Sequence, residues 1–254
     1  MYAIIGGTGL DRLADLEVVR REVMRTPYGE PSSAFTFGKL KGNDVVFLAR
    51  HGHGHTIPPH RINYRANLWA LSEAKVEGVV AIASVGSIRA TLNPGDLLAP
   101  DQIIDYTHGR GHTYFDGTGA PVTHIDFTWP YSPSMRERLL AAAKTAGETL
   151  QDGAVYGATQ GPRLETAAEI RRMERDGCDL VGMTGMPEAA LARELGLPYA
   201  CLAVVVNHAA GLGDSKQMIS VEHLDEMARK AMASVYRILE ALVALPGPAA
   251  AAKA

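Results

Sequence analysis

The chain has 254 residues, 46% of them hydrophobic and 21% charged, and a formal net charge of −3 at pH 7. These values indicate a globular protein that buries one sizeable core. The acidic balance argues against a nucleic-acid or anionic-membrane surface, because both kinds of partner favour a basic excess. An anionic small molecule remains a possible ligand if cations cluster locally.

The cysteines and the N-terminus both predict a cytoplasmic protein. Cys178 and Cys201 lie in apolar, strand-like runs, which is typical of core thiols in a reducing compartment. The apolar run at residues 2–5 follows no basic segment and is too short for a signal peptide. No run approaches the roughly 18 apolar residues that a membrane-spanning helix needs.

Three strands are expected in the first third of the chain, and each ends in small or polar residues. They cover residues 2–5, 44–49 and 78–83, and helical spacing of apolar residues predicts a helix over 63–75. A further strand is expected over 96–105, where Pro100 indicates a bulge or an edge. Residues 106–133 read as a long loop, which in a compact domain is usually functional. An amphipathic helix follows over 134–147.

The second half alternates strands and helices. The pattern predicts strands at 154–159, 178–181 and 199–206, separated by a helix at 166–175 that Gly177 ends and by a helix starting at Pro187. An apolar stripe predicts a closing helix over 221–245. This order is typical of the α/β class, with a central, mostly parallel sheet flanked by helices. We expect one domain over residues 1–245 and a disordered tail at 246–254.

The ends of the strands supply groups suited to an oxyanion. If the sheet is parallel, the residues that follow its strands gather at one edge, where open α/β sheets bind ligands. Arginine offers a planar fork of donors, histidine another donor, and hydroxyls and glycine-rich N–H groups fill the remainder, which suits phosphate. The candidate phosphate ligands are Thr8, Arg50, His51, Ser84 and Thr184. A plain glycine turn and a surface ion pair are the alternative interpretations of Thr8 and Arg50.

Glu165 and Asn207 form a second pair with a different chemistry. A carboxylate accepts hydrogen bonds, whereas an amide both donates and accepts. Glu165 could accept from N1–H of a 6-oxopurine, while Asn207 donates to O6 and accepts from a protonated N7. A 6-aminopurine would leave buried groups unpaired. A solvated acid at a helix start and an Asx turn are the alternatives for the two residues.

The histidines at positions 51, 53, 55 and 60 invite a metal interpretation, since alternate residues of an extended strand share a face. Two glycines intervene, however, and no carboxylate lies between Asp44 and Glu73. We therefore expect no metal site, and we interpret His55 and His60 as loop histidines that organise the site.

Four segments resemble the family of trimeric purine nucleoside phosphorylases and methylthioadenosine phosphorylases. They are IIGGTGL (4–10), ARHGHGHTIPPHRINYRANLWAL (49–71), QGPRLET (160–166) and GMTGMPEAALARE (182–194), and the collinear resemblance covers residues 2 to about 245. Within the family, the chain is most similar to the 6-oxopurine-selective member that acts on S-methyl-5'-thioinosine. The family's adenine-specific members carry aspartates at the positions of Asn207 and Ala209, and this chain has neither.

The resemblance implies a role for particular positions. Thr8, Arg50, His51 and Thr184 match phosphate ligands. Ser84 is a less certain one, because the methylthioadenosine enzymes have Thr-Ala where this chain has Ala83-Ser84. The residues expected to contact the nucleoside are Met183, Glu165, Asn207, His208, Ala209, His124, Val221 and Leu224. Among these, the resemblance implies that His124 contributes to the site of a neighbouring subunit. Val221 and Leu224 match apolar residues near the 5' position, and simple helix packing is the alternative for these two residues.

The expected reaction is phosphorolysis of S-methyl-5'-thioinosine to hypoxanthine and 5-methylthioribose 1-phosphate, with Asn207, Thr184 and Arg50 as the catalytic groups. Inorganic phosphate is a co-substrate, and no cofactor is expected. The resemblance implies a homotrimer with sites near the subunit interfaces. The alternatives are an inosine/guanosine phosphorylase, a methylthioadenosine phosphorylase, a metal-dependent hydrolase using the 51–60 histidines, and a non-catalytic nucleotide-binding module.

Overall fold

The computed structural model describes residues 1–10, 12–117, 121–219 and 221–246, without the side chains of 221–223 and 225. The predicted tail therefore lies outside the described residues, apart from residue 246. The helices are α1 (Tyr64–Glu73), α2 (Pro133–Ala146), α3 (Ala167–Asp176), α4 (Gly185–Glu194) and α5 (Val221–Ala244), with short 3-10 turns at Pro59–Arg61 and Gly213–Ser215. None of the described helices is both long and apolar enough to cross a bilayer.

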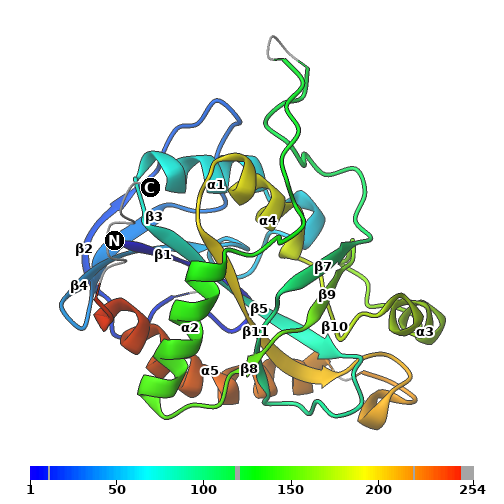
Figure 1. The fold of residues 1–254 in the computed structure, drawn as a ribbon. Helices are drawn as coiled ribbons and strands as arrows, with labels where there is room; N and C mark the ends of the chain where they lie inside the picture. The colour runs from blue at the N-terminus through cyan, green and yellow to red at the C-terminus, as the bar shows by residue number, and fades with distance from the viewer. Residues whose placement is uncertain (11, 118–120, 220, 247–254) are drawn as a thin grey trace.

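Eleven strands form one mixed sheet in the described chain, which confirms the α/β class (Figure 1). They are β1 (Tyr2–Gly6), β2 (Glu17–Glu22), β3 (Phe35–Leu40), β4 (Asn43–Ala49), β5 (Gly78–Ser87), β6 (Leu97–Ala99), β7 (Gln102–Asp105), β8 (Gln151–Asp152), β9 (Val155–Ala158), β10 (Leu180–Gly182) and β11 (Tyr199–His208). The break between β6 and β7 falls at Pro100, as its missing N–H predicts.

The sheet is parallel around its first strand and turns antiparallel beyond β5. Strand β1 pairs in parallel with β4 and β5, and β11 pairs in parallel with β5. Strand β10 pairs with β5 in the antiparallel sense, while β9 and β10 are parallel to each other. We expected the strand ends to meet at one edge because all strands would run in the same direction. The strands of this sheet do not all run in the same direction. Strands β9 and β10 reach the same region from the opposite direction.

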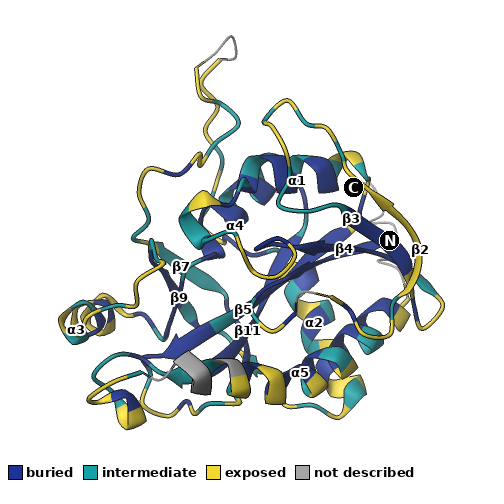
Figure 2. Cartoon of the chain, turned by 180° about the vertical axis from the view of Figure 1, so that it is seen from behind, coloured by how far each residue is buried: buried dark blue, intermediate teal, exposed yellow. Residues whose placement is uncertain are grey.

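Apolar residues cover both faces of the sheet. Along β1, Ala3 and Ile5 pack on one face in a core that includes α1 and α4, whereas Tyr2 and Ile4 pack on the other face with α2 and α5. This is the period-two alternation of a strand buried on both sides, and Figure 2 shows the central strands as the most buried part of the molecule. Both cysteines are buried and free, as predicted, and burial raises the pKa of the Cys201 thiol to about 12.

One long excursion leaves this body between β7 and α2. The described residues between 106 and 132, which we call the arm, project away from the sheet before the chain returns to α2 (Figure 1). The long-loop prediction for 106–133 is confirmed in the described residues, except that Pro133 already belongs to α2. Ser132 caps α2 by accepting a hydrogen bond from the backbone N–H of Met135, so the chain re-enters the body at a defined helix start.

Candidate active site

A cavity of about 950 Å³ opens where the carboxyl ends of β1, β4 and β10 meet the second half of β5 and the end of β11. It brings together most of the residues singled out from the sequence. The predicted residues that line it are Thr8, Arg50, His51, Ser84, Glu165, Met183, Thr184, Asn207, Ala209 and Leu224. Residues from five separate strand ends or turns and from the interior of β5 therefore share one site, although the sheet is mixed.

Arg50 defines the polar corner of this cavity. It is 1% exposed and follows the last residue of β4. Its Nη1 donates to the carbonyl of Ile82 at 2.9 Å, and a Cβ on Gly7 would lie 3.1 Å from that nitrogen and 2.5 Å from the same carbonyl oxygen. The glycine turn after β1 therefore lacks a side chain at Gly7 because the arginine and β5 occupy that space.

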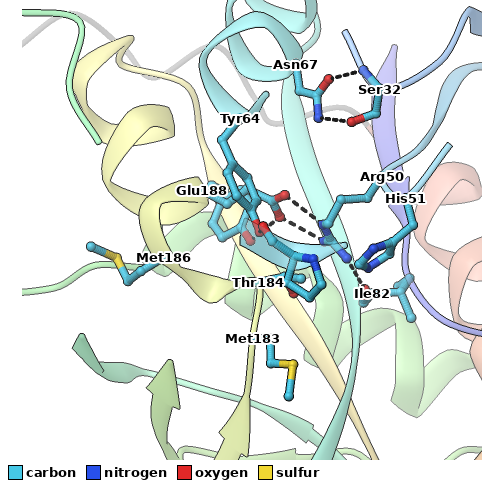
Figure 3. A network of polar contacts seen from close by, with 12 residues as sticks. Ser32, Arg50, His51, Tyr64, Asn67, Ile82, Met183, Thr184, Met186 and Glu188 are labelled. Carbon is cyan, nitrogen blue, oxygen red and sulfur yellow. Dashed lines mark hydrogen bonds and ion pairs between the residues drawn. The ribbon is translucent and has the colours of Figure 1, made fainter. Parts of the chain in front are cut away.

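Glu188 forms a bidentate ion pair with the Arg50 guanidinium (Figure 3). Nε and Nη2 of Arg50 each donate to a different carboxylate oxygen at 2.8 Å, and Tyr199 also donates to Glu188 at 2.8 Å. Burial alone would lower the pKa of Arg50, but the adjacent carboxylate more than reverses this, so the pKa lies above its usual value. The pair is formally neutral, and it presents oriented N–H groups to the cavity instead of a net charge.

His51 is a neutral ring in this structure. Burial and the neighbouring Arg50 charge lower its pKa to about 4. Its Nδ1 lies 2.9 Å from the carbonyl oxygen of Ile57, which only accepts, so Nδ1 carries the proton and Nε2 is an acceptor. We expected His51 to donate to an oxyanion. The observed bond instead suits Nε2 to accept from the hydroxyl of a protonated phosphate.

Thr184 closes the polar corner from the side of β10. It is 8% exposed and precedes α4, whose residue Met186 has an extended backbone (φ −119°, ψ 140°), so regular helix starts at Pro187 as predicted. The backbone N–H of Thr184 donates to the Tyr156 hydroxyl at 3.4 Å and does not serve as a free anion donor. Its side-chain hydroxyl lies beside the same tyrosine hydroxyl, and Thr184 lines the cavity.

Ser84 lies inside β5 and not on a turn, because that strand continues to Ser87. Its hydroxyl donates to the backbone carbonyl of Thr8 at 3.3 Å, which ties β5 to the glycine turn. Ser84 lines the cavity, yet its hydroxyl proton is used within the protein.

Glu165 and Asn207 also line the cavity. Glu165 accepts from the Thr159 hydroxyl at 2.6 Å through one carboxylate oxygen, which leaves the second oxygen for a ligand. Asn207 donates one side-chain N–H to the carbonyl of His208, so its other N–H and its oxygen remain for a ligand. The pairing register shifts between Val205 and Asn207, so Val206 and Asn207 both face the cavity instead of alternating.

Two predicted ligand residues, His208 and His124, do not line this cavity, and a third, Val221, is not tested. The ring of His208 lies against Gly213 with Nδ1 3.5 Å from the backbone nitrogen of Asp214, because it faces away from the neighbouring Asn207. His124 is exposed on the arm and does not line the cavity of its own chain. The side chain of Val221 lies outside the described residues, so its predicted contact stays a prediction.

Two of the cavity residues that were missed from the sequence lie near the start of the closing helix. Ile219, just before α5, adds to the apolar wall that Leu224 forms, and Arg229 of α5 places a cation at the cavity lining. Neither belongs to a motif. Only their position near the start of the closing helix, five residues before and five residues after Leu224, could have indicated them.

The histidines at 51–60 do not form a metal centre in the part of the chain that the structure describes. His51 and His55 stack with ring centroids 4.3 Å apart, and His53 lines a separate, smaller pocket. No group of three or more histidine, cysteine, aspartate or glutamate side chains is placed to share an ion among the described residues.

An oxyanion corner and a carboxylate–amide corner in one cavity of a mixed α/β sheet are the features of an enzyme that cleaves nucleosides with phosphate. The comparison with protein families agrees, and the chain belongs to the phosphorylase superfamily, whose model matches residues 1–244.

Individual relatives narrow the class. The chain is 56% identical to a probable S-methyl-5'-thioinosine phosphorylase of Xanthomonas campestris over 89% of this chain and 90% of the relative. It is 46% identical to a 6-oxopurine nucleoside phosphorylase of Pyrococcus furiosus over 96% of this chain and 92% of the relative. Among solved structures, a Schistosoma mansoni methylthioadenosine phosphorylase in complex with adenine superposes with a TM-score of 0.91 at 31% identity, covering 96% and 90% of the two chains.

Proposed function

We propose that the protein catalyses the phosphorolysis of S-methyl-5'-thioinosine in purine salvage. A phosphate oxygen forms a bond to C1' of the sugar while the C1'–N9 bond breaks and its electron pair passes to the base. The proton of hydrogen phosphate ends on the base, giving hypoxanthine and 5-methylthioribose 1-phosphate. The observation that carries this proposal is the convergence of Arg50, Thr184 and Asn207 on one cavity.

Phosphate occupies the corner of Arg50, His51 and Thr184 in this proposal. The fixed guanidinium and the threonine hydroxyl donate to its oxygens, and neutral His51 accepts from its remaining hydroxyl. The sugar carbon gains positive charge as the base departs, and the phosphate held beneath it stabilises that charge before adding. Positioning and electrostatics then supply most of the rate, without a protein nucleophile or a further cofactor.

The base lies between Glu165 and Asn207. The free oxygen of Glu165 accepts from N1–H, and the remaining N–H and oxygen of Asn207 serve O6 and the proton on N7. Negative charge that develops on the departing purine is stabilised by this amide. Selectivity for 6-oxopurines follows from the N–H of Asn207, which donates to O6. A 6-amino group would place a second donor opposite that N–H.

The 5' substituent meets an apolar wall. Ile219 and Leu224 line the cavity with hydrocarbon, and a buried 5'-hydroxyl would lose its hydrogen bonds to water there. A methylthio group carries no such penalty. This supports the methylthio nucleoside over inosine or guanosine.

Chromatographic assay of base release tests the proposal. We expect hypoxanthine from S-methyl-5'-thioinosine only when phosphate is present, with lower kcat/KM for inosine, guanosine and methylthioadenosine. Release of base without phosphate would indicate a hydrolase, and binding without any release would indicate a non-catalytic nucleoside-binding module. Preference for methylthioadenosine would contradict the assignment of Asn207.

We further propose that the enzyme is a cytoplasmic homotrimer with sites near the subunit interfaces. The arm exposes Val122 by 79% and Trp129 by 56%, which is an apolar surface suited to contact with another copy. His124 lies on the same segment and would reach a neighbour's cavity. A purine nucleoside and phosphate are the only other partners proposed.

A further inference from the structure

Arg110 is a buried cation at the base of the arm. Its side chain is 7% exposed, yet it does not line the cavity. The residue follows Gly109, whose φ of +65° turns the chain so that the next side chain enters the body. A substitution at Arg110 therefore removes no group that faces a ligand.

The guanidinium of Arg110 joins two neighbouring turns, one that follows β10 and carries Thr184 and one that follows β9 and leads to Glu165. Nη1 donates to the carbonyl oxygens of Met183 at 2.9 Å and Met186 at 2.6 Å, on either side of Thr184. Nη2 donates to the carbonyl oxygens of Thr159 at 3.1 Å and Gln160 at 2.8 Å. Thr159 in turn holds Glu165, so one planar group spans the phosphate-side and purine-side turns.

Hydrogen bonds around Arg110 also connect the base of the arm to the turn that carries Gln160. The side-chain oxygen of Gln160 accepts from Nε of Arg110 at 3.1 Å and from the backbone N–H of His108 at 3.1 Å. Nη1 also lies 3.3 Å from the hydroxyl of Tyr64, which donates to the carbonyl of Pro59 in the cavity wall. With these partners, every N–H of the guanidinium has an acceptor.

These acceptors are carbonyl, amide and hydroxyl oxygens, and none of the hydrogen bonds described for Arg110 is to a carboxylate. Burying a charge without a counter-ion is costly unless its hydrogen bonds are satisfied in full. Lysine could not replace it, because its three donors lack the fixed planar fork. The arrangement is therefore specialised for holding several carbonyls at set positions.

We propose that Arg110 is a positioning residue that sets the separation between the oxyanion corner and the purine corner. It acts through the backbone of Met183–Met186 and of Thr159–Gln160, and it fixes both to the base of the arm. This inference rests on the proposed function, because its consequence is the alignment of phosphate, sugar and base. A misplacement of about 1 Å between reacting groups can cost on the order of 100-fold in rate.

The test compares Arg110→Ala and Arg110→Lys with a matched control, Arg136→Ala. Arg136 also donates to two backbone carbonyls, of Pro100 at 2.9 Å and Ala99 at 3.1 Å, but it lies outside the cavity. We would measure kcat and KM for S-methyl-5'-thioinosine and for phosphate, together with Tm. We expect kcat/KM to fall about 100-fold in Arg110→Ala and at least about tenfold in Arg110→Lys, with Arg136→Ala within about twofold of the parent at a similar loss of Tm.

Chemical rescue separates positioning from a general loss of structure. Guanidinium ion at concentrations far below those that unfold the protein should restore part of the activity of Arg110→Ala, whereas urea, a neutral molecule of the same shape, should not. If Arg110→Ala does not fold, the kinetics of Arg110→Lys decide. Kinetics for both Arg110 variants that match Arg136→Ala would overturn the inference alone. An unsubstituted protein without phosphate-dependent base release would overturn the proposed function, and this inference with it.

Discussion

At the scale of single residues, His51 shows how a buried environment selects one form of a side chain. Its pKa in the fold, about 4, lies below the ordinary value of 6.5 because of burial and of Arg50. As the pH falls from about 6.5 to about 4, the unfolded chain takes up a proton that the folded chain does not. Folding is therefore most favourable above this window, and the His51 contribution, on the order of 3 kcal/mol, is lost across it.

The variant His51→Asn should lack this loss. The asparagine amide can still donate to the Ile57 carbonyl, but it does not titrate. We expect the free energy of unfolding, measured with urea between about pH 7 and pH 4, to fall more steeply in the parent than in the variant. Other groups titrate equally in both proteins, so parallel curves would contradict the neutral-ring assignment.

The site residues that could be predicted from the sequence combine a suitable side-chain chemistry with a position at the end of a strand. Arg50, Thr184 and Asn207 follow or end strands, and they meet at the cavity. The partner of Arg50 could not be predicted, because Glu188 is 138 positions away and looks like an ordinary acid at a helix start. Arg110 gave no signal either, since most of its partners are backbone carbonyls, which every residue has.

At the scale of elements, the β-bulge in β11 places the purine-reading amide. Regular alternation would put Val206 and Asn207 on opposite faces, and the shift after Val205 brings both to the cavity. A bulge re-aims a side chain without changing the strand's neighbours. The amide can therefore be exchanged for a carboxylate of the same shape in the same place.

Asn207→Asp should reverse the preference between purines. An aspartate cannot donate to O6, but it can accept from a 6-amino group and from a protonated N7. We expect the ratio of kcat/KM for methylthioinosine over methylthioadenosine to fall by at least about 100-fold. Asn43→Asp, at an exposed turn where the amide bonds the Lys41 carbonyl, provides the control. Full retention of the 6-oxo preference would show that another group reads the base.

Sequence periodicity predicted most helices and central strands but not the elements set by long-range pairing. Strand β2 is exposed along its whole length and carries no buried face, so no apolar alternation marks it. The reversal at β10 was also invisible, because an apolar run has no direction until its partner is known. Strand β5 runs four residues beyond its predicted end because its second half pairs with β10.

At the scale of the whole molecule, the arm is the segment whose position does not follow from packing against the sheet. Its described part extends beyond the two packed faces of the sheet (Figure 1). It carries exposed apolar side chains and the exposed His124, which does not line the cavity of its own chain. Its base is fixed to the site by Arg110 and Gln160. A segment rooted at one cavity and exposed at its far end is suited to complete the cavity of another copy.

Subunit complementation tests this arrangement. His124→Ala keeps an intact cavity with a defective arm, and Glu165→Ala keeps an intact arm with a defective cavity, so each homo-oligomer should have low kcat/KM. If His124 serves a neighbouring copy, co-expressed mixtures should recover activity in about a quarter of their sites, since each intact site needs one suitable cavity and one suitable arm. Light scattering of the purified protein should give three times the mass of one chain. A monomer, or mixtures no more active than the average of the two variants, would place the action of His124 within its own chain or exclude it from the site.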